Sequence, residues 1–311
     1  MLLATGRAPG KIILCGEHAV VYGRPALAVP VEQVQAVATV ESAEPGAGVL
    51  LAADDLGEVV SLAPDDAGHP LAVITRLTLA HLGLPVPDWR VRVRSTVPIA
   101  SGLGSGAAVS AAIAKALAAA AGRDLSPAEV SDLVYETEKI HHGTPSGIDN
   151  TVIAYDRPVY FRRDQLPAPF AIRRPFSLVI ADSGIPSPTR VAVGDLRRAW
   201  QEDPERIEAL FDRVEQIVEA VRAALAAGRP GELGPMLDAN QEILGTLGVS
   251  CPELDRLVAA ARAAGAAGAK LSGGGRGGNL IALVTDETAA DVAAALAEAG
   301  AVRTITTTVG T

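Results

Sequence analysis

The sequence predicts an α+β fold that is divided into two domains. The chain has 311 residues, of which 49% are hydrophobic, and this length is typical of about two globular domains. The first part of the chain contains short apolar runs between Gly and Pro residues, which are typical of strands. From about residue 176 onward, long helical patterns alternate with short apolar runs, which indicates helices packed on a sheet. We place the boundary so that the predicted domains span residues 1–172 and 173–311.

The N-terminal part is predicted to be rich in strands. Apolar or alternating runs separated by Gly, Pro and charged residues predict three short strands, over Lys11–Cys15, Leu27–Pro30 and Val34–Val40. Residues 41–70 contain many Gly, Pro, Asp and Ala residues, so we expect hairpins and loops there. In residues 89–97 arginines alternate with apolar residues, which predicts a strand with one face in water.

Two helices follow in the sequence. A glycine-rich segment, Pro98–Gly106, separates the last strand from an Ala-rich helix predicted over Ala107–Ala121. The next helix is expected to begin at Ser126, because Ser is a good N-cap, a Pro follows at the first helical position, and Glu129 completes a capping box. It should run to about His142 and stop at the Gly that follows.

The second domain is predicted to consist of long helices packed on one face of an antiparallel sheet. Periodicity and turn signals predict four helices, over residues 189–200, 204–227, 231–246 and 252–264. They predict four strands, over Phe176–Ala181, Ala269–Ser272, Leu280–Val284 and Val302–Thr308.

The composition excludes several classes of protein. With 27 Lys and Arg against 36 Asp and Glu, the formal net charge is −9, which argues against nucleic acid or a membrane as partner. The Ala-rich helix over Ala107–Ala121 is interrupted by Lys115 and built of small residues, so it is predicted to lie in a protein core. Ile12–Cys15 is too short for a signal sequence and is expected to be a strand, so the predicted location is the cytoplasm.

The cysteines predict neither a disulfide framework nor a zinc site. The chain has two, Cys15 and Cys251, which are far apart in sequence and show no C-x-x-C spacing. We therefore expect two reduced, partly buried thiols.

The strongest local signal is the sequence of strand, glycine loop and helix over residues 89–121. Gly102, Gly104 and Gly106 allow backbone conformations closed to other residues and a close approach by a ligand. The N-terminus of the following helix offers free N–H groups and the positive end of its dipole, which together bind anions. The segment is neither a Walker A loop nor a dinucleotide fingerprint. Taken alone, it is equally compatible with a tight strand–helix turn.

A second glycine cluster, Gly273–Gly278, lies between two predicted strands. Five glycines exceed what a hairpin needs. Close backbone approach to a ligand or to the other glycine loop would explain them, and a flexible turn is the alternative.

Two acidic residues follow in or after the helix that begins at Ser126. One stripe at helical spacing on that helix is made by Val130, Leu133, Val134, Thr137 and His141. Glu138 lies at the edge of this stripe, where a carboxylate needs a partner such as Mg²⁺. Asp149 follows a Pro- and Gly-containing turn that can direct its side chain into a cleft. For either acid alone, a helix cap or a surface salt bridge is the commoner explanation, and the two His residues at 141 and 142 are compatible with a helix C-terminus.

A further polar group surrounds the first predicted strand. Lys11 begins the strand, and Glu17 and His18 follow its apolar run. A lone Lys at a strand start is usually solvated, whereas a polar pair directly after an apolar strand is harder to explain by solvation alone.

Together these segments resemble the superfamily of galactokinase, homoserine kinase, mevalonate kinase and phosphomevalonate kinase, known as the GHMP kinases. Its three motifs occur in order as PGKIILCGEHAVVYG, PIASGLGSGAA and KLSGGGRGG. Within the superfamily, GEHAVVYG followed by HGTPSGIDN looks most like the mevalonate kinases, as do DSGIPSPTR and NQEILGTLGVS. The resemblance spans nearly the whole chain. It implies an N-terminal domain like domain 2 of ribosomal protein S5 and a ferredoxin-like C-terminal domain.

The resemblance also implies a role for individual residues. Asp149 would be the catalytic base and Lys11 would pair with it. Glu138 would bind Mg²⁺, with Ser105 as a second possible ligand, and ATP would be the phosphoryl donor. Residues that hold the substrate acid would be Glu17, His18 and Thr189. The ATP phosphates would be held by Ser101, Gly102, Leu103, Gly104, Ser105, Gly106 and Ala107.

The sequence departs from the family pattern at two positions. Gly106 stands where family members commonly have a second Ser that helps to hold Mg²⁺, so the metal would be held by Ser105, by water, or by Glu138 and the phosphates alone; we favour the last, with a water filling the gap. Arg276 stands where Gly or Ala is more usual. Its side chain would reach a phosphate or point into solvent.

The implied activity is transfer of the γ-phosphate of ATP to the 5-hydroxyl of mevalonate in isoprenoid biosynthesis. The main alternative is another kinase of the superfamily, especially phosphomevalonate kinase, which would need additional cations for a second phosphate. A non-catalytic ligand-binding relative is less compatible with the presence of Lys11, Glu138 and Asp149. The resemblance makes a homodimer plausible.

Overall fold

The structure is a computed structural model that describes residues 1–55, 57–62, 68–99, 101–142, 145–163, 165–187 and 189–310. The predicted helix stop at Gly143 and the predicted burial of His141 lie outside what it describes. Contacts between residues divide the chain into two compact units, which we describe separately. The first comprises Met1–Lys11, Val34–Ile99 and Leu103–Asp156, and the second comprises Ile12–Gln33, Ala100–Gly102 and Arg157–Thr311.

The first unit contains a sheet of the order β4-β3-β5-β2, with β1 paired to β2. Its strands are β1 (Leu2–Cys15), β2 (Ala26–Ser42), β3 (Val49–Ala53), β4 (Glu58–Ser61) and β5 (Trp89–Ser95), of which β1 and β2 continue into the second unit. Strand β3 pairs parallel to β5 and antiparallel to β4. The predicted alternation in β5 is confirmed, because Val91 and Val93 are buried while the intervening arginines are exposed.

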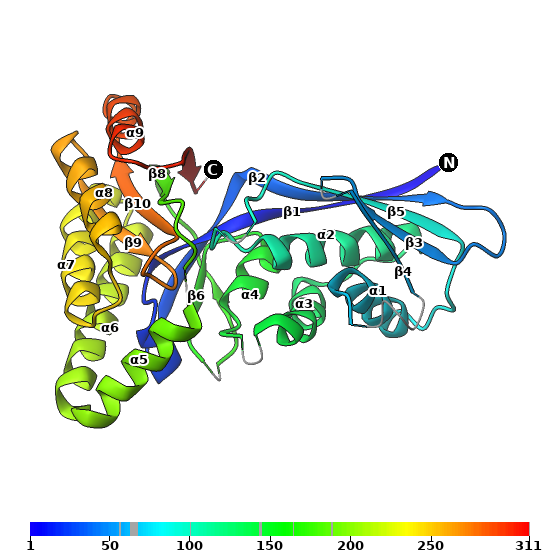
Figure 1. The fold of residues 1–311 in the computed structure, drawn as a ribbon, viewed down its shortest axis with the longest axis horizontal. Coiled ribbons are helices and arrows are strands. Elements are labelled where there is room, and N and C mark those ends of the chain that lie inside the picture. Colours follow the sequence, from blue (N-terminus) through cyan, green and yellow to red (C-terminus); the bar gives the residue numbers. More distant parts are fainter. Residues whose placement is uncertain are drawn as a thin grey trace. The chain divides into compact units, whose positions relative to one another are not determined.

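Four helices cover one face of this sheet (Figure 1): α1 (Pro70–His81), α2 (Ser105–Ala120), α3 (Pro127–His142) and α4 (Ile148–Tyr155). Helix α2 is built of small residues because it packs very close to β1: a Cβ on Gly6 would lie 2.2 Å from the carbonyl oxygen of Ala112. The predicted capping box is confirmed, since the Ser126 N–H donates to Glu129 Oε2 over 2.8 Å and the Glu129 N–H donates to Ser126 Oγ over 3.3 Å.

Three predictions for this part of the chain were incomplete or wrong. The strands predicted over Leu27–Pro30 and Val34–Val40 form one strand, β2. Pro30 does not end it and lies between the stretch that pairs with strand β6 (Val159–Phe161) and the stretch that pairs with β5. Helices α1 and α4 were not predicted.

The second unit contains a four-stranded antiparallel sheet of the order β11-β8-β10-β9. Its strands are β8 (Phe176–Asp182), β9 (Gly268–Ser272), β10 (Asn279–Val284) and β11 (Arg303–Val309), and helices α8 (Pro252–Ala263) and α9 (Ala289–Glu298) pack on one face (Figure 1). A core of apolar side chains joins them, among them Val179, Leu257, Leu280, Val292 and Leu296. The predicted antiparallel sheet and the predicted helix α8 on its face are confirmed, whereas α9 was not predicted.

Further helices of this unit are α5 (Thr189–Glu202), α6 (Pro204–Ala226) and α7 (Leu233–Thr246), with the short strands β6 (Val159–Phe161) and β7 (Ala168–Pro169) pairing along the start of β2. Helix α7 covers the edge strand β9. The backbone N–H of Ala269 donates to Asp238 over 2.9 Å, and that of Leu271 donates to Gln241 over 2.8 Å. These bonds satisfy backbone groups that an edge strand leaves free.

The remaining predictions concern boundaries, thiols and membranes. Residues of the second unit come from three separate stretches of chain, and the boundary between 172 and 173 stays a proposal. Both cysteines are free thiols, with Cys15 buried and Cys251 half-buried, as predicted. Within the described residues, we find no helix with the length and apolar character that a membrane crossing requires.

Candidate active site

In the first unit the structure brings Lys11 and Asp149 together. The Nζ atom of Lys11 lies 3.0 Å from Oδ1 of Asp149. Asp149 lies in the first turn of α4. The N-cap of this helix is Gly147, whose φ of 88° is accessible to glycine without strain. The first turn of a helix is a favourable place for a carboxylate, and here it directs Asp149 toward Lys11.

The glycine loop of the first unit lies against the same lysine. The N–H of Lys11 donates to the carbonyl oxygen of Leu103 over 3.0 Å, and a Cβ on Gly104 would lie 3.2 Å from Cγ of Lys11 and 2.8 Å from Cδ1 of Ile153. Gly104 also has a φ of 76°, and it is the N-cap of α2, which begins at Ser105, two residues earlier than predicted. Glycine is therefore required at this position by both conformation and space.

This arrangement suits an anion. Helix α2 has no side-chain cap, so the N–H groups of its first turn, at Ser105, Gly106 and Ala107, are left for another acceptor. Of the seven residues predicted to hold phosphates, the first unit contains five. Ser101 and Gly102 fall in the second unit, where the carbonyl oxygen of Ser101 accepts a hydrogen bond from the side chain of Asn279.

Glu138 of α3 belongs to the same cluster as Lys11 and Asp149. Burial is the main cause that raises the pKa of the Glu138 carboxyl well above its ordinary value, and the negative charge of Asp149 adds to it. The positive charge of Lys11 acts in the opposite direction. Two carboxylates thus share one ammonium group. A Cβ on Gly106 would lie 3.9 Å from Oε1 of Glu138, so this carboxylate lies over the first turn of α2.

A divalent cation fits this donor set. It would supply the positive charge that two carboxylates beside one lysine lack, and carboxylate oxygens are the ligands that Mg²⁺ prefers. Within the described residues, no three His, Cys, Asp or Glu side chains form a group that could hold a metal by themselves. Phosphate oxygens would therefore have to complete the coordination.

In the second unit the predicted substrate residue Glu17 forms a buried ion pair that the sequence analysis missed. Lys270 of β9 is fully buried, and its Nζ contacts both Oε1 of Glu17 and the carbonyl oxygen of Leu271. Oε2 of Glu17 has no hydrogen-bond partner among the described residues. A lysine between Ala269 and Leu271, inside an apolar strand, was the signal in the sequence, because a buried Lys requires a buried acid.

His18 follows Glu17 and is buried in a strained conformation. Its φ is 62°, at the start of the short 3₁₀ helix η1 (Ala19–Tyr22), and such values are uncommon outside glycine. Burial lowers the pKa of His18 to about 4, and the nearby positive charges of Lys270 and Arg276 act in the same direction, while a hydrogen bond with the backbone of Gly274 opposes them. The ring is therefore neutral at physiological pH.

The second glycine cluster packs against other backbone segments of the second unit. A Cβ would lie 2.2 Å from Oγ1 of Thr189 if placed on Gly274, and 2.0 Å from the carbonyl oxygen of Val249 if placed on Gly275. Close packing within the second unit thus explains these glycines. Thr189, the third residue predicted to hold the substrate, is the first residue of α5 and is exposed.

Arg276 does not simply point into solvent, because its guanidinium forms an ion pair with Asp195 of α5. The alternative that it reaches a phosphate stays a prediction.

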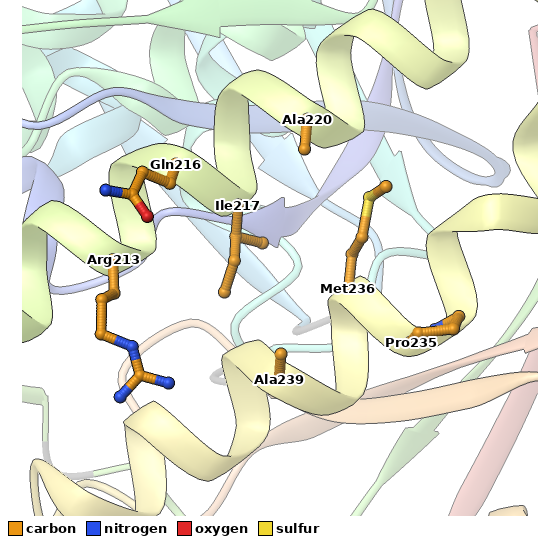
Figure 2. Close-up of a pocket in the computed structure, with 7 residues that line it drawn as sticks. All are labelled: Arg213, Gln216, Ile217, Ala220, Pro235, Met236 and Ala239. Atoms are coloured by element: carbon orange, nitrogen blue, oxygen red, sulfur yellow. The ribbon is translucent and has the colours of Figure 1, made fainter.

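The second unit also has a groove between α6 and α7 with a volume of about 330 Å³ (Figure 2). Figure 2 shows Ile217 and Ala220 of α6 and Met236 and Ala239 of α7 lining it, so its surface is largely apolar. None of the predicted site residues lines it.

Comparison with known proteins defines the class first. The model of the GHMP kinases N terminal domain matches residues 71–157, and that of the GHMP kinases C terminal domain matches residues 221–302. The chain is therefore a GHMP kinase, with the α+β two-domain fold of that class.

Similar full-length proteins define the family. The mevalonate kinase of Pyrococcus horikoshii is 33% identical and the alignment covers 96% of this chain and 93% of that protein. The mevalonate kinase of Thermococcus gammatolerans is 34% identical, with coverage of 96% and 94%. A crystal structure of L. major mevalonate kinase in complex with R-mevalonate is 28% identical, with a TM-score of 0.85 and coverage of 98% and 95%. The chain belongs to the mevalonate kinase family.

Proposed function

We propose that the chain transfers the γ-phosphate of ATP to the 5-hydroxyl of mevalonate, which yields 5-phosphomevalonate and ADP in isoprenoid biosynthesis. The observation that carries the proposal is the ion pair of Lys11 and Asp149 beside the glycine loop at the start of α2. Family membership supports mevalonate as the acceptor.

The phosphate chain of ATP would be bound by the glycine loop. Phosphoryl transfer passes through a loose transition state, so an enzyme accelerates it mainly by positioning the reactants and neutralising charge. The N–H groups of Ser105, Gly106 and Ala107 point to such a role, since they lie at the positive end of α2. The ammonium of Lys11 adds a full positive charge next to them.

Asp149 would act as the base. As the 5-hydroxyl oxygen forms its bond to the γ-phosphorus and the bond between that phosphorus and the bridging oxygen of ADP breaks, the hydroxyl proton passes to the Asp149 carboxylate. Lys11, at 3.0 Å from that carboxylate, would stabilise the negative charge on the attacking oxygen and on the transferring group. Its buried position strengthens this effect, because less water screens the charge.

Glu138 would hold Mg²⁺ together with the ATP phosphates, with Ser105 as a second possible ligand. The metal, when bound, would neutralise phosphate charge. The shortage of positive charge around Glu138 and Asp149 supports this assignment. Because Gly106 offers no hydroxyl, we propose that a water takes the place of the second serine ligand of related kinases.

We propose that the substrate acid is held by Glu17, His18 and Thr189. Thr189 supports it with an exposed hydroxyl at the start of α5. Glu17 would act through its ion pair with Lys270, which fixes the turn that carries His18. A homodimer and a cytoplasmic location also stay predictions.

The test is a coupled ADP-release assay with Mg-ATP, in which mevalonate, phosphomevalonate, homoserine and galactose are offered separately. Asp149→Asn removes the base, and Asp156→Asn, at the other end of α4, is the matched control. We expect turnover on mevalonate that Asp149→Asn abolishes and Asp156→Asn retains. Turnover on another alcohol would overturn the assigned substrate, and ATP binding without turnover on any of them would favour a ligand-binding protein.

A further inference from the structure

Two buried residues of the first unit tie helix α4 to helix α3. The side-chain nitrogen Nδ2 of Asn150, in the first turn of α4, donates to the Oγ atom of Ser131 in α3 over 2.9 Å and to the Ser131 carbonyl oxygen over 3.2 Å. Asn150 is 4% exposed and Ser131 is 6% exposed, so water hardly competes for these bonds. Both helices belong to the first unit. The contact therefore helps to fix the two helices relative to each other.

The hydrogen bonds continue along the first turn of α4. The Oγ1 atom of Thr151 donates to the carbonyl oxygen of Gly147, the N-cap of the helix, over 2.6 Å. Because that bond uses the Thr151 proton, the Ser131 hydroxyl is the donor over the 3.5 Å that separates the two hydroxyl oxygens. A directed chain thus runs from Asn150 through Ser131 and Thr151 to Gly147. It encloses the turn that carries Asp149.

The chain links the two helices that carry the acids of the candidate active site. Asp149 directly precedes Asn150 in α4, and Glu138 lies seven residues after Ser131, two turns along the same face of α3. Val134, which lies between them on that face, is fully buried. The placement of Asp149 relative to Glu138 therefore depends on how α3 and α4 are held together.

The second polar atom of the Asn150 side chain indicates that packing alone does not explain this residue. Its Oδ1 atom is buried and has no hydrogen-bond partner among the described residues. A buried polar atom without a partner costs free energy, so an apolar side chain of similar volume would fill the same space at a lower cost. What the amide contributes instead is the pair of directed N–H bonds to Ser131.

We propose that Asn150 and Ser131 are positioning residues that fix Asp149, the proposed base, relative to Glu138, the proposed metal ligand. This rests on the proposed function for the roles of the two acids. Two carboxylates repel each other, so without this tie the first turn of α4 is expected to move away from α3. The metal site would then be weakened and the base misplaced.

The test uses Ser131→Ala, Asn150→Leu and the double variant. Ser131→Ala removes one hydroxyl from the chain and does not weaken α3 itself, because Ala has a higher helix propensity than Ser. Asn150→Leu removes both bonds and keeps the volume of the side chain. Thr78→Val in α1 is the matched control. Thr78 is fully buried and its Oγ1 atom donates to the carbonyl oxygen of Ile74 over 2.8 Å, so this variant loses a buried hydroxyl that joins no second helix.

Two readouts separate positioning from stability. The first needs no turnover: calorimetry without an acceptor gives the Kd of ATP with Mg²⁺ and with EDTA, and the ratio of the two values reports what the metal contributes to binding. The second readout is the Mg²⁺ concentration required for half-maximal phosphorylation of mevalonate, together with kcat and KM.

In the unmodified protein we expect Mg²⁺ to tighten the binding of ATP. Asn150→Leu should reduce this effect about tenfold, raise the Mg²⁺ requirement by about as much and lower kcat at least about tenfold, with the KM for mevalonate within about threefold. Ser131→Ala should act in the same direction but less, since the Ser131 carbonyl still accepts from Asn150. The double variant should be no worse than Asn150→Leu, because both changes interrupt one chain. Thr78→Val should behave like the unmodified protein.

An unchanged Mg²⁺ effect in both Asn150→Leu and Ser131→Ala would overturn the proposal even if both proteins are less stable, because the bonds would then serve the fold alone. An equal change in Thr78→Val would overturn it too, as would ATP binding that does not depend on Mg²⁺ in the unmodified protein. If Asn150→Leu does not fold, Ser131→Ala decides. If mevalonate is not phosphorylated, the proposed function fails, and the ATP titrations still decide whether Asn150 and Ser131 position the acids.

Discussion

The ammonium of Lys11 and the carboxylate of Asp149 form an ion pair in which only one partner is accessible. The two atoms lie 3.0 Å apart, the Lys11 side chain is 5% exposed, and the Asp149 side chain is 30% exposed. The carboxylate can therefore receive a proton from a bound alcohol while the lysine stays shielded from water. That asymmetry is suited to a base supported by a fixed positive charge.

Replacing Lys11 by Met should lower kcat by about 10²–10³-fold, because it removes a charge that acts on the transition state. Binding of ATP, followed by fluorescence or calorimetry, should weaken much less. Lys115→Met, a half-buried lysine of α2 outside the cluster, is the control and should retain kcat. A Lys11→Met protein with kcat within tenfold of the original would contradict the role of Lys11.

Gly104→Ala should destabilise the protein by more than about 1 kcal/mol. The alanine would have to adopt a φ of 76°. Its Cβ would lie 2.8 Å from Cδ1 of Ile153 and 3.2 Å from Cγ of Lys11. Gly122→Ala separates the two causes, because Gly122 also has a positive φ of 68° but has no atom within 4 Å of the Cβ position. Urea unfolding of both variants would show the difference, and equal losses would mean that packing at Gly104 contributes nothing.

Gly106→Ser should lower the Mg²⁺ concentration required for half-maximal activity several-fold. A Cβ at this position would lie 3.9 Å from Oε1 of Glu138, so a serine hydroxyl would stand beside the proposed metal ligand, and no positive φ opposes the change. Gly106→Ala adds the same Cβ without the hydroxyl. If the two variants show the same Mg²⁺ dependence, the hydroxyl supplies no ligand and the proposed water at this place is not supported.

Lys270→Met should reduce the free energy of unfolding by about 3–5 kcal/mol, because it leaves the buried carboxylate of Glu17 without its partner. Adding Glu17→Gln should restore part of the loss, since no uncompensated charge then remains. Lys139→Met removes the exposed pair with Glu136 and should change little. Denaturant titrations would measure all three, and a double variant as unstable as the single one would argue against a charge effect.

Lowering the pH should reduce the free energy of unfolding, because His18 is buried in its neutral form. Burial lowers its folded pKa to about 4, from an ordinary value of 6.5, so the unfolded chain binds more protons in between. The contribution of His18 to stability is thus fully present above pH 6.5 and is lost as the pH falls toward 4. The loss should be of order 3 kcal/mol. Unfolding free energies at pH 7.5 and 4.5 would fall more in the original protein than in His18→Gln; identical slopes would rule out this titration.

Local patterns in the sequence were sufficient wherever neighbours along the chain determine the structure. The alternation of arginines in β5 and the capping box of Ser126 and Glu129 arise from contacts between residues a few positions apart, and the structure has both. The antiparallel sheet of the second unit followed from short apolar strands between long helices. The glycine loop and the acids Glu138 and Asp149 each had an ordinary structural explanation, and only their occurrence together with the other motifs, in the order of the GHMP kinases, indicated a site.

Only the tertiary structure decided the partners of the buried charges. Lys270 and Glu17 are distant in sequence, and nothing near Arg276 along the chain indicates that it pairs with Asp195. Ion pairs of this kind depend on long-range packing, whereas periodicity reports which face of one element is buried. The sequence by itself therefore determined the family and predicted the pairing of Lys11 with Asp149 that the structure has. The fold decided that His18 is neutral, because burial and the charges around its ring come from segments far apart in the chain.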